Sequence, residues 1–100
     1  MAQYTVSTIQ DALQSVCSDS RIKRVVLFGS YAKGKAREQS DIDLYLDSGR
    51  QITGFDFFAL RAKFEDALGT EIDLLPDIDI VPNSSIDREI RRHGVTVYVQ

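Results

Sequence analysis

The stretch GSYAKGKAREQSDIDLYLD, residues 29–47, organises the rest of this chain. It follows an apolar run, VVLF at 25–28, which has the β-branched and apolar composition of a buried strand. The stretch opens with a Gly-Ser pair, continues through a basic loop that contains glycine, and closes in a run of alternating carboxylates. This order of strand, turn, basic loop and acidic strand indicates chemistry on a phosphate.

In the run 41–47 polar and apolar residues alternate, and successive side chains of a strand point to opposite faces. The apolar set is expected to face the core and comprises Ile42, Leu44 and Leu46. Asp41 and Asp43 share the other face, where their mutual repulsion is unfavourable unless a cation lies between them. Ligands that are all oxygens favour magnesium or manganese. The sequence therefore predicts a divalent metal site on this face.

The turn before this strand has the features of an anion site. Gly29 is placed where φ is positive or where a ligand approaches the backbone closely, and Ser30 is expected to begin a short helix. The N-terminus of such a helix offers unpaired N–H groups to an anion. Three loop cations, Lys33, Lys35 and Arg37, lie where they would meet phosphate oxygens. Taken alone, the Gly-Ser pair favours an ordinary strand-to-helix turn, and the cations favour a solvated loop.

Length and composition limit the classes of function. The chain has 100 residues, 43% of them apolar, which predicts one globular domain over residues 1–100 without room for a second substrate-binding domain. A net charge of -3 argues against extended nucleic-acid binding, and the local grouping of the basic residues favours one small anion. The single cysteine, Cys17, excludes an internal disulfide. No stretch resembles a signal peptide or a membrane span, so we expect a cytoplasmic protein.

Periodicity predicts helices and strands in alternation, and hence an α/β or α+β domain. The expected helices cover 5–18, 55–68 and the segment around Ile86 and Ile90. The expected strands cover 22–28, 41–47, 71–75 and 95–99. We expect Gly69 to end the second helix and Gly94 to end the third, with Asn83 or Ser84 as the N-cap of the third.

The helix at 55–68 is apolar on two sides. One side is the expected core face and comprises Phe57, Leu60, Phe64, Ala67 and Leu68. The nearly opposite side comprises Phe55, Phe58, Ala59 and Ala62. Such a helix is either sandwiched within its own domain or presents one side to another chain, since apolar surface patches often mark contacts. The sequence leaves both possibilities open.

Two later acidic segments compete for the role of third carboxylate. Alternation in the expected strand 71–75 places Asp73 on the polar face. Asp77 and Asp79 repeat the spacing of the first pair, but Pro76 and Pro82 flank them, which is typical of a loop or an edge segment. We therefore expect Asp73 to belong to the site and the later pair to be a coincidence of spacing.

Gly29-Ser30, ten intervening residues, Asp41-x-Asp43 and the later Asp73 together resemble the DNA-polymerase-β-like nucleotidyltransferase superfamily. The fuller string GSYAKGKAREQSDIDLYLD looks like the minimal nucleotidyltransferase branch of that superfamily. The resemblance is specific over residues 25–47 and extends in order and spacing through residue 75. It implies a small mixed β-sheet with helices packed on it.

The resemblance also implies roles for single residues. Gly29 and Ser30 would hold the β- and γ-phosphates of a nucleoside triphosphate. The carboxylates that would bind two divalent ions, Mg²⁺ or alternatively Mn²⁺, and serve catalysis are Asp41, Asp43 and Asp73. Asp73 is the candidate to help deprotonate the attacking hydroxyl. The other residues that would steady the phosphates are Lys33, Arg37 and Ser40. Lys33 stands where many relatives have arginine, a change that keeps the charge but loses the bidentate fork.

The minimal branch that the chain resembles is typically paired with a small all-helical HEPN protein. Its members act as antitoxins that transfer AMP to a tyrosine of that toxin. The resemblance therefore implies a protein adenylyltransferase that uses ATP and releases pyrophosphate. Two alternatives stay open: a non-catalytic antitoxin or nucleotide-binding subunit, and transfer to a small-molecule hydroxyl in the cleft of an oligomer. The complete set of three aspartates favours the enzyme.

Overall fold

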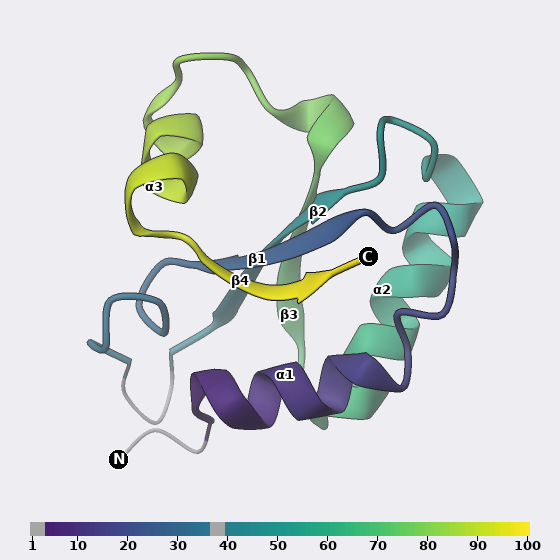
Figure 1. Ribbon diagram of the computed structural model, residues 1–100, viewed down its shortest axis with the longest axis horizontal. Helices are drawn as coiled ribbons and strands as arrows, with labels where there is room; N and C mark the ends of the chain where they lie inside the picture. The colour runs from purple at the N-terminus through teal and green to yellow at the C-terminus, as the bar shows by residue number, and fades with distance from the viewer. Residues whose placement is uncertain (1–3, 37–39) are drawn as a thin grey trace.

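The computed structural model describes residues 4–36 and 40–100, and these form a mixed sheet with the strand order β3-β2-β1-β4 (Figure 1). The strands are β1 Arg24–Phe28, β2 Ile42–Asp47, β3 Ile72–Pro76 and β4 Val95–Val99. The helices are α1 Val6–Gln14, α2 Gly54–Leu68 and α3 Ser85–His93, with a short 3-10 turn, η1, at Asp77–Asp79. β1 runs antiparallel to β2 and β4, whereas β2 and β3 are parallel, which confirms the expected mixed sheet.

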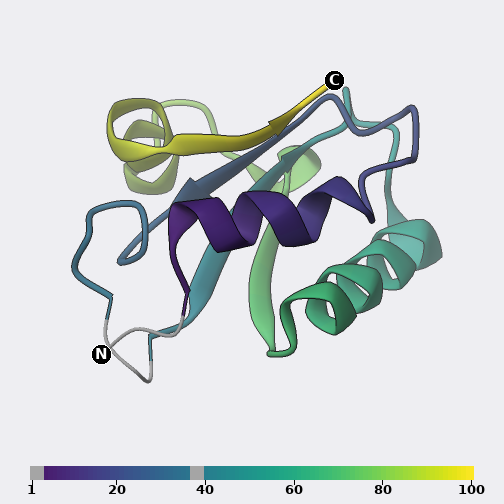
Figure 2. The same ribbon diagram turned by 60° about the horizontal axis from the view of Figure 1, so that its bottom comes forward.

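Helices cover both faces of this sheet. α1 and α2 lie side by side on one face and α3 lies on the other (Figures 1 and 2). Val25 and Leu27 of β1 belong to the large core beneath α1 and α2, whereas Val26 and Phe28 pack with Ile90 of α3. The first strand is therefore buried on both faces, as its continuous apolar sequence predicts.

The helix ends follow the capping residues in the sequence. Gly69 takes φ 72° directly after α2, and Gly94 follows α3, as predicted. The Ser84 hydroxyl accepts a hydrogen bond from Asp87 N at 3.2 Å and caps the start of α3. α1 ends at Gln14 instead of the expected residue 18, because the chain then turns to carry Cys17 into the core. No helix within residues 4–36 and 40–100 combines the length and apolar character needed to cross a bilayer.

The two apolar sides of α2 have different environments. The buried residues of the helix are Leu60, Phe64 and Leu68, which confirms the predicted core face. On the other side Phe55 is 93% exposed and Phe58 is 62% exposed. α2 is thus not sandwiched within its own domain, and the prediction that remains is a contact with another chain.

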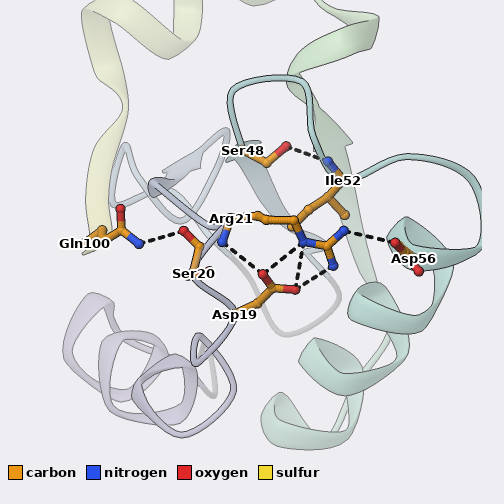
Figure 3. Close-up of polar contacts among 7 residues, drawn as sticks. All are labelled: Asp19, Ser20, Arg21, Ser48, Ile52, Asp56 and Gln100. Atoms are coloured by element: carbon orange, nitrogen blue, oxygen red, sulfur yellow. Dashed lines mark hydrogen bonds and ion pairs between the residues drawn. The ribbon is translucent and has the colours of Figure 1, made fainter.

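Arg21 ties the connection before β1 to the start of α2, away from the acidic strands. Its guanidinium donates to Asp19 Oδ2 at 2.7 Å and to Asp56 Oδ2 at 3.0 Å (Figure 3). The hydrogen bonds from Arg21 lower the pKa of Asp19 to about 2. Beside it, Gln100 Nε2 donates to the Ser20 carbonyl at 2.7 Å and fastens the end of the chain (Figure 3). The Arg21 cation therefore supports the fold and does not serve as an anion site.

Candidate active site

Two carboxylates from different strands meet at the centre of the predicted site. The parallel register of β2 and β3 pairs Asp43 with Asp73, so both side chains project from the same face of the sheet. This is the face that α3 partly covers, because Phe28, the antiparallel partner of Asp43, packs beneath α3. Both carboxylates line a cavity of about 350 Å³, together with Phe28, Arg61, Leu74, Leu75 and Ile86.

The environment of Asp43 disfavours its charged form. The pKa of this carboxyl is raised to about 6, and burial is the largest cause. The charge of Asp73, a hydrogen bond with Asp73, and the charges of Asp41 and Glu89 contribute to the same rise. A carboxylate that three other carboxylates repel is stabilised by an added positive charge. Perturbed carboxyls of this kind, placed in a cavity, are typical of functional sites.

Gly29 brings the Gly-Ser turn directly against Asp43. It takes φ 75°, a conformation that side chains rarely adopt, and thereby confirms the prediction of a positive φ. A Cβ atom at this position would overlap the Asp43 carboxylate and would lie 3.2 Å from its Cγ. Only glycine fits here, so the backbone of the turn and the carboxylate can face one ligand together.

The segment after Ser30 is a set of hydrogen-bonded turns, and the predicted short helix is absent from residues 29–36. Lys33 N donates to the Gly29 carbonyl at 3.2 Å and Lys35 N donates to the Ser30 carbonyl at 2.9 Å. Gly34 takes φ 69°, which is incompatible with a continuing right-handed helix. The prediction of a short helix after Ser30 was therefore wrong, and the anion site at this turn stays a prediction.

The sequence matches the family described as polymerase beta nucleotidyltransferase over residues 9–100. The chain belongs to this nucleotidyltransferase family. The match covers almost the whole chain and includes the Gly-Ser turn, both acidic strands and α3. It confirms the resemblance that the spacing of Gly29, Ser30, Asp41, Asp43 and Asp73 indicated.

Individual relatives agree with this assignment. The nucleotidyltransferase is 30% identical to the protein adenylyltransferase MntA of Thermococcus cleftensis over 101 residues, covering 97% of this chain and 100% of that protein. A solved structure provisionally called a minimal nucleotidyltransferase is 28% identical, with a TM-score of 0.75 over 95% of this chain and 98% of that one. An antitoxin structure, solved as the complex of a tri-AMPylated Shewanella oneidensis HEPN toxin with MNT antitoxin, shares the fold with a TM-score of 0.70 at 15% identity, covering 96% of this chain and 74% of that one.

The donor set of the nucleotidyltransferase suits a divalent cation. Asp43 and Asp73 supply adjacent carboxylate oxygens, and a cation would relieve the repulsion that raises the pKa of Asp43. Asp41 is exposed and directly precedes β2. In the part of the chain that the structure describes, no three such side chains are already gathered in a metal-binding cluster. The assignment of Asp41 as a ligand beside the other two therefore stays a prediction.

The predicted phosphate residues lie around the Gly-Ser turn with different surroundings. Lys33 Nζ forms an ion pair with Glu89 Oε1 of α3 at 2.5 Å, so this cation is held toward the face that carries Asp43. Ser40 is half-buried just before β2. Arg37 lies outside the described residues. A phosphate that binds Lys33 as predicted would compete with Glu89 for the same ammonium group.

Glu89→Gln is expected to strengthen nucleotide binding about 2–5-fold, which corresponds to the free energy of a half-exposed ion pair. The substitution releases Lys33 and removes one negative charge that acts on Asp43. Titration with the ATP analogue AMP-PNP in the presence of magnesium measures the change. Asp11→Asn, on the exposed side of α1, removes the same charge from the other face and serves as the control. Weaker binding by Glu89→Gln than by Asp11→Asn would contradict a competition for Lys33.

Sequence reasoning missed three residues of the site. Glu89 follows Lys33 by 56 positions, and no local spacing links the two. Arg61 and Ile86 enter the cavity from helices on opposite faces of the sheet. The sequence signal for Ile86 was its spacing of four residues from Ile90, which puts both on one side of the helix. α3 buries Ile90 and leaves Ile86 47% exposed.

Proposed function

We propose that the chain transfers AMP from ATP to a hydroxyl of a partner protein, a tyrosine of a HEPN toxin, and thereby acts as its antitoxin. The observation that carries this proposal is the juxtaposition of Asp43 and Asp73 with the Gly29 turn. The backbone of the Gly29 turn lies against Asp43, and Asp43 lines one cavity together with Asp73. The adenylyltransferase name of the Thermococcus relative, which aligns over its whole length, supports the same reaction.

The residues divide the work by position. Gly29 and Ser30 hold the β- and γ-phosphates through the backbone of the turn, Lys33 and Arg37 neutralise their charge, and Ser40 helps to orient them. The carboxylates that would hold two magnesium ions are Asp41, Asp43 and Asp73. Bound magnesium supplies charge stabilisation for the phosphoryl oxygens during an in-line displacement. Asp73 accepts the proton of the attacking hydroxyl, and pyrophosphate remains on the Gly29 turn as the leaving group.

A protein acceptor is supported by two observations of different kinds. The fold is that of an antitoxin solved in complex with an AMPylated HEPN toxin. The exposed aromatic side of α2 in this chain is the type of surface that another protein covers. The first favours a HEPN-type partner, and both favour a protein acceptor over a small molecule.

A transfer assay with two labelled substrates tests the reaction. The chain is incubated with magnesium and a candidate HEPN-type partner protein, using ATP labelled on either the α- or the γ-phosphate. We expect the partner to retain the α-label and not the γ-label, and magnesium chelation to abolish the signal. Retention of the γ-label would identify a kinase instead. Tight binding without either label would identify a non-catalytic antitoxin.

Phe55→Ser and Phe58→Ser are expected to weaken the partner complex by at least about 10-fold each while leaving the free energy of unfolding nearly unchanged. Both rings are exposed in the isolated chain, so a polar replacement there removes little packing. Calorimetric titration with the partner and thermal unfolding of the free chain measure the two effects. The contrasting control is Phe64→Ala, which empties the core and should cost about 3–5 kcal/mol of stability. Unchanged partner affinity for both serine variants would remove α2 from the interface.

A further inference from the structure

The predicted active-site residues lie in order across three neighbouring strands of the sheet. The Gly29 turn lies at the end of β1, Asp43 lies on the neighbouring β2, and Asp73 lies on β3. Among the strands that the structure describes, β3 has only one neighbour and therefore forms an edge. A ligand held by its phosphates at the turn and by its reacting centre at Asp43 leaves the β3 side for a second reactant.

The cavity at the carboxylates wraps around this edge. Leu74 and Leu75 are consecutive in β3 and point to opposite faces of the sheet, yet both line the cavity. Arg61 of α2 and Ile86 of α3 complete its walls from the two sides. The cavity is thus open across β3 toward solvent and not closed by either helix layer.

A second cavity, of about 260 Å³, continues from the first along η1 and α3. The two cavities share Leu75 and Ile86. The additional lining residues are Asp79, Ile80, Val81 and Ser84. Val81 is 65% exposed and Ile86 is 47% exposed, so the groove presents apolar surface to solvent directly beside Asp73. We call this continuous surface, from Asp73 past Ile86 to Val81, the edge groove.

We propose that the edge groove is the acceptor site, and that it seats a polypeptide segment with an apolar side chain next to its acceptor hydroxyl. This inference rests on the proposed function. In an in-line displacement the nucleophile approaches opposite the leaving group. With the leaving phosphates on the Gly29 turn, that approach comes from the Asp73 side, where the groove begins. Its length beyond Asp73 and its apolar walls suit a protein segment better than a lone hydroxyl.

In this arrangement the proton and the leaving group of the transfer step each have a defined destination. The acceptor O–H gives its proton to the Asp73 carboxylate, and the acceptor oxygen forms a bond to the α-phosphorus. The bond from the α-phosphorus to the oxygen that bridges to the β-phosphate breaks, and pyrophosphate leaves with that electron pair. The apolar side chain beside the acceptor stays against Ile86 and Leu75 throughout, so the groove fixes which hydroxyl reaches Asp73.

Thiol protection tests this placement without depending on catalysis. The native Cys17 is buried and its pKa is raised to about 12, so a cysteine introduced at the surface is the reactive thiol of the chain. Ile86→Cys places such a thiol in the edge groove. Val99→Cys, in β4 at the opposite edge of the sheet and 68% exposed, is the matched control. Maleimide labelling of each variant is timed alone, with the HEPN-type partner, and with magnesium and AMP-PNP.

The expected result is that the partner slows labelling at position 86 at least 10-fold, that AMP-PNP leaves it unchanged, and that position 99 is unaffected by both. Protection of position 86 by AMP-PNP, with or without protection by the partner, would overturn the proposal because the groove would then hold the nucleotide. Labelling that neither ligand slows would also overturn it. Partner protection without transfer by the wild-type chain would reject the proposed function and keep the docking site.

A kinetic measurement gives a second, independent readout. Ile86→Asn is expected to raise KM for the partner at least 10-fold with AMP-PNP affinity unchanged, since a polar amide in the groove disfavours an apolar segment and adds no charge beside Asp43. Circular dichroism confirms that the variant is folded, which its half-exposed position favours. Loss of AMP-PNP affinity in the folded variant, with partner KM unchanged, would contradict the assignment.

Discussion

Asp43→Asn is expected to lower nucleotide transfer by about 10³-fold or more while leaving the fold intact. Asp43 is the carboxylate that contacts both sides of the site, since it lies against the Gly29 turn and beside Asp73. Asparagine keeps the shape of the side chain but removes the charge that would hold magnesium. Single-turnover transfer at saturating magnesium measures the loss. A transfer rate for Asp43→Asn equal to that of the wild type would contradict the hypothesis that the site needs a bound metal ion.

The same substitution is expected to stabilise the metal-free protein at alkaline pH. Because the folded state raises the pKa of Asp43 from 3.8 to about 6, this carboxyl favours folding in its neutral form, and that contribution is lost as the pH rises through 6. Asparagine mimics the neutral form. The free energy of unfolding of Asp43→Asn should exceed that of the wild type by on the order of 1 kcal/mol at pH 8, after allowance for solvent screening. The difference should vanish below about pH 4.

Thermal unfolding in the presence of a chelator measures whether Asp43→Asn is more stable than the wild type. A gain of about 1 kcal/mol corresponds to a rise in Tm of roughly 4–8 °C for a chain of this size. Magnesium should then raise the Tm of the wild type and leave that of Asp43→Asn unchanged. The matched control is Asp47→Asn, which removes a carboxylate from the same strand, where Asp47 faces Arg24 and not the cavity. Equal effects of the two substitutions would show that the repulsion is not specific to the site.

The features that the sequence predicted correctly depend on interactions between residues that are close together in the chain. Alternation alone placed Ile42 and Leu44 in the core and Asp43 on the open face. Gly69 ends α2 because a positive φ after a helix favours glycine, and Ser84 starts α3 because its hydroxyl satisfies a free N–H. Each of these signals depends on residues within four positions of the feature that it predicts.

The features that the sequence did not predict depend on contacts between distant segments. The ion pair of Lys33 with Glu89 requires α3 to lie near the Gly-Ser turn, and Ile90 of α3 is held there by packing with Val26 and Phe28. The backbone after Ser30 was misread as a helix because the pattern did not reveal that Gly34 also adopts a positive φ. Phe55 is exposed because of the way α2 is rotated about its axis on the sheet. The sequence could not predict that rotation, because two sides of the helix are apolar.

Asp73→Asn and Asp77→Asn are expected to separate catalysis from stability. Asp73 is exposed on the edge strand and pairs in register with Asp43, so its loss should reduce the transfer rate about 10²–10⁴-fold, with little change in Tm. Asp77 has a different role. Its Oδ2 accepts hydrogen bonds from Ser48 N at 3.2 Å and from Arg50 N at 2.8 Å, and so holds the turn that follows β2.

The asparagine at position 77 keeps one oxygen but weakens both of these bonds, because a charged acceptor binds N–H groups more strongly than an amide does. We expect Asp77→Asn to lower the free energy of unfolding by about 1–2 kcal/mol and to leave the transfer rate within about threefold of wild type. Asp79→Asn, at an exposed position of η1, should change the free energy of unfolding little. Asp79 lines the part of the edge groove away from Asp73, so at saturating partner the transfer rate of this variant should also stay close to wild type. Rates from single-turnover transfer and stabilities from urea unfolding give the ranking. A larger loss of rate at position 77 than at position 73 would mean that the acidic 3-10 turn, and not the edge strand, supplies the third carboxylate.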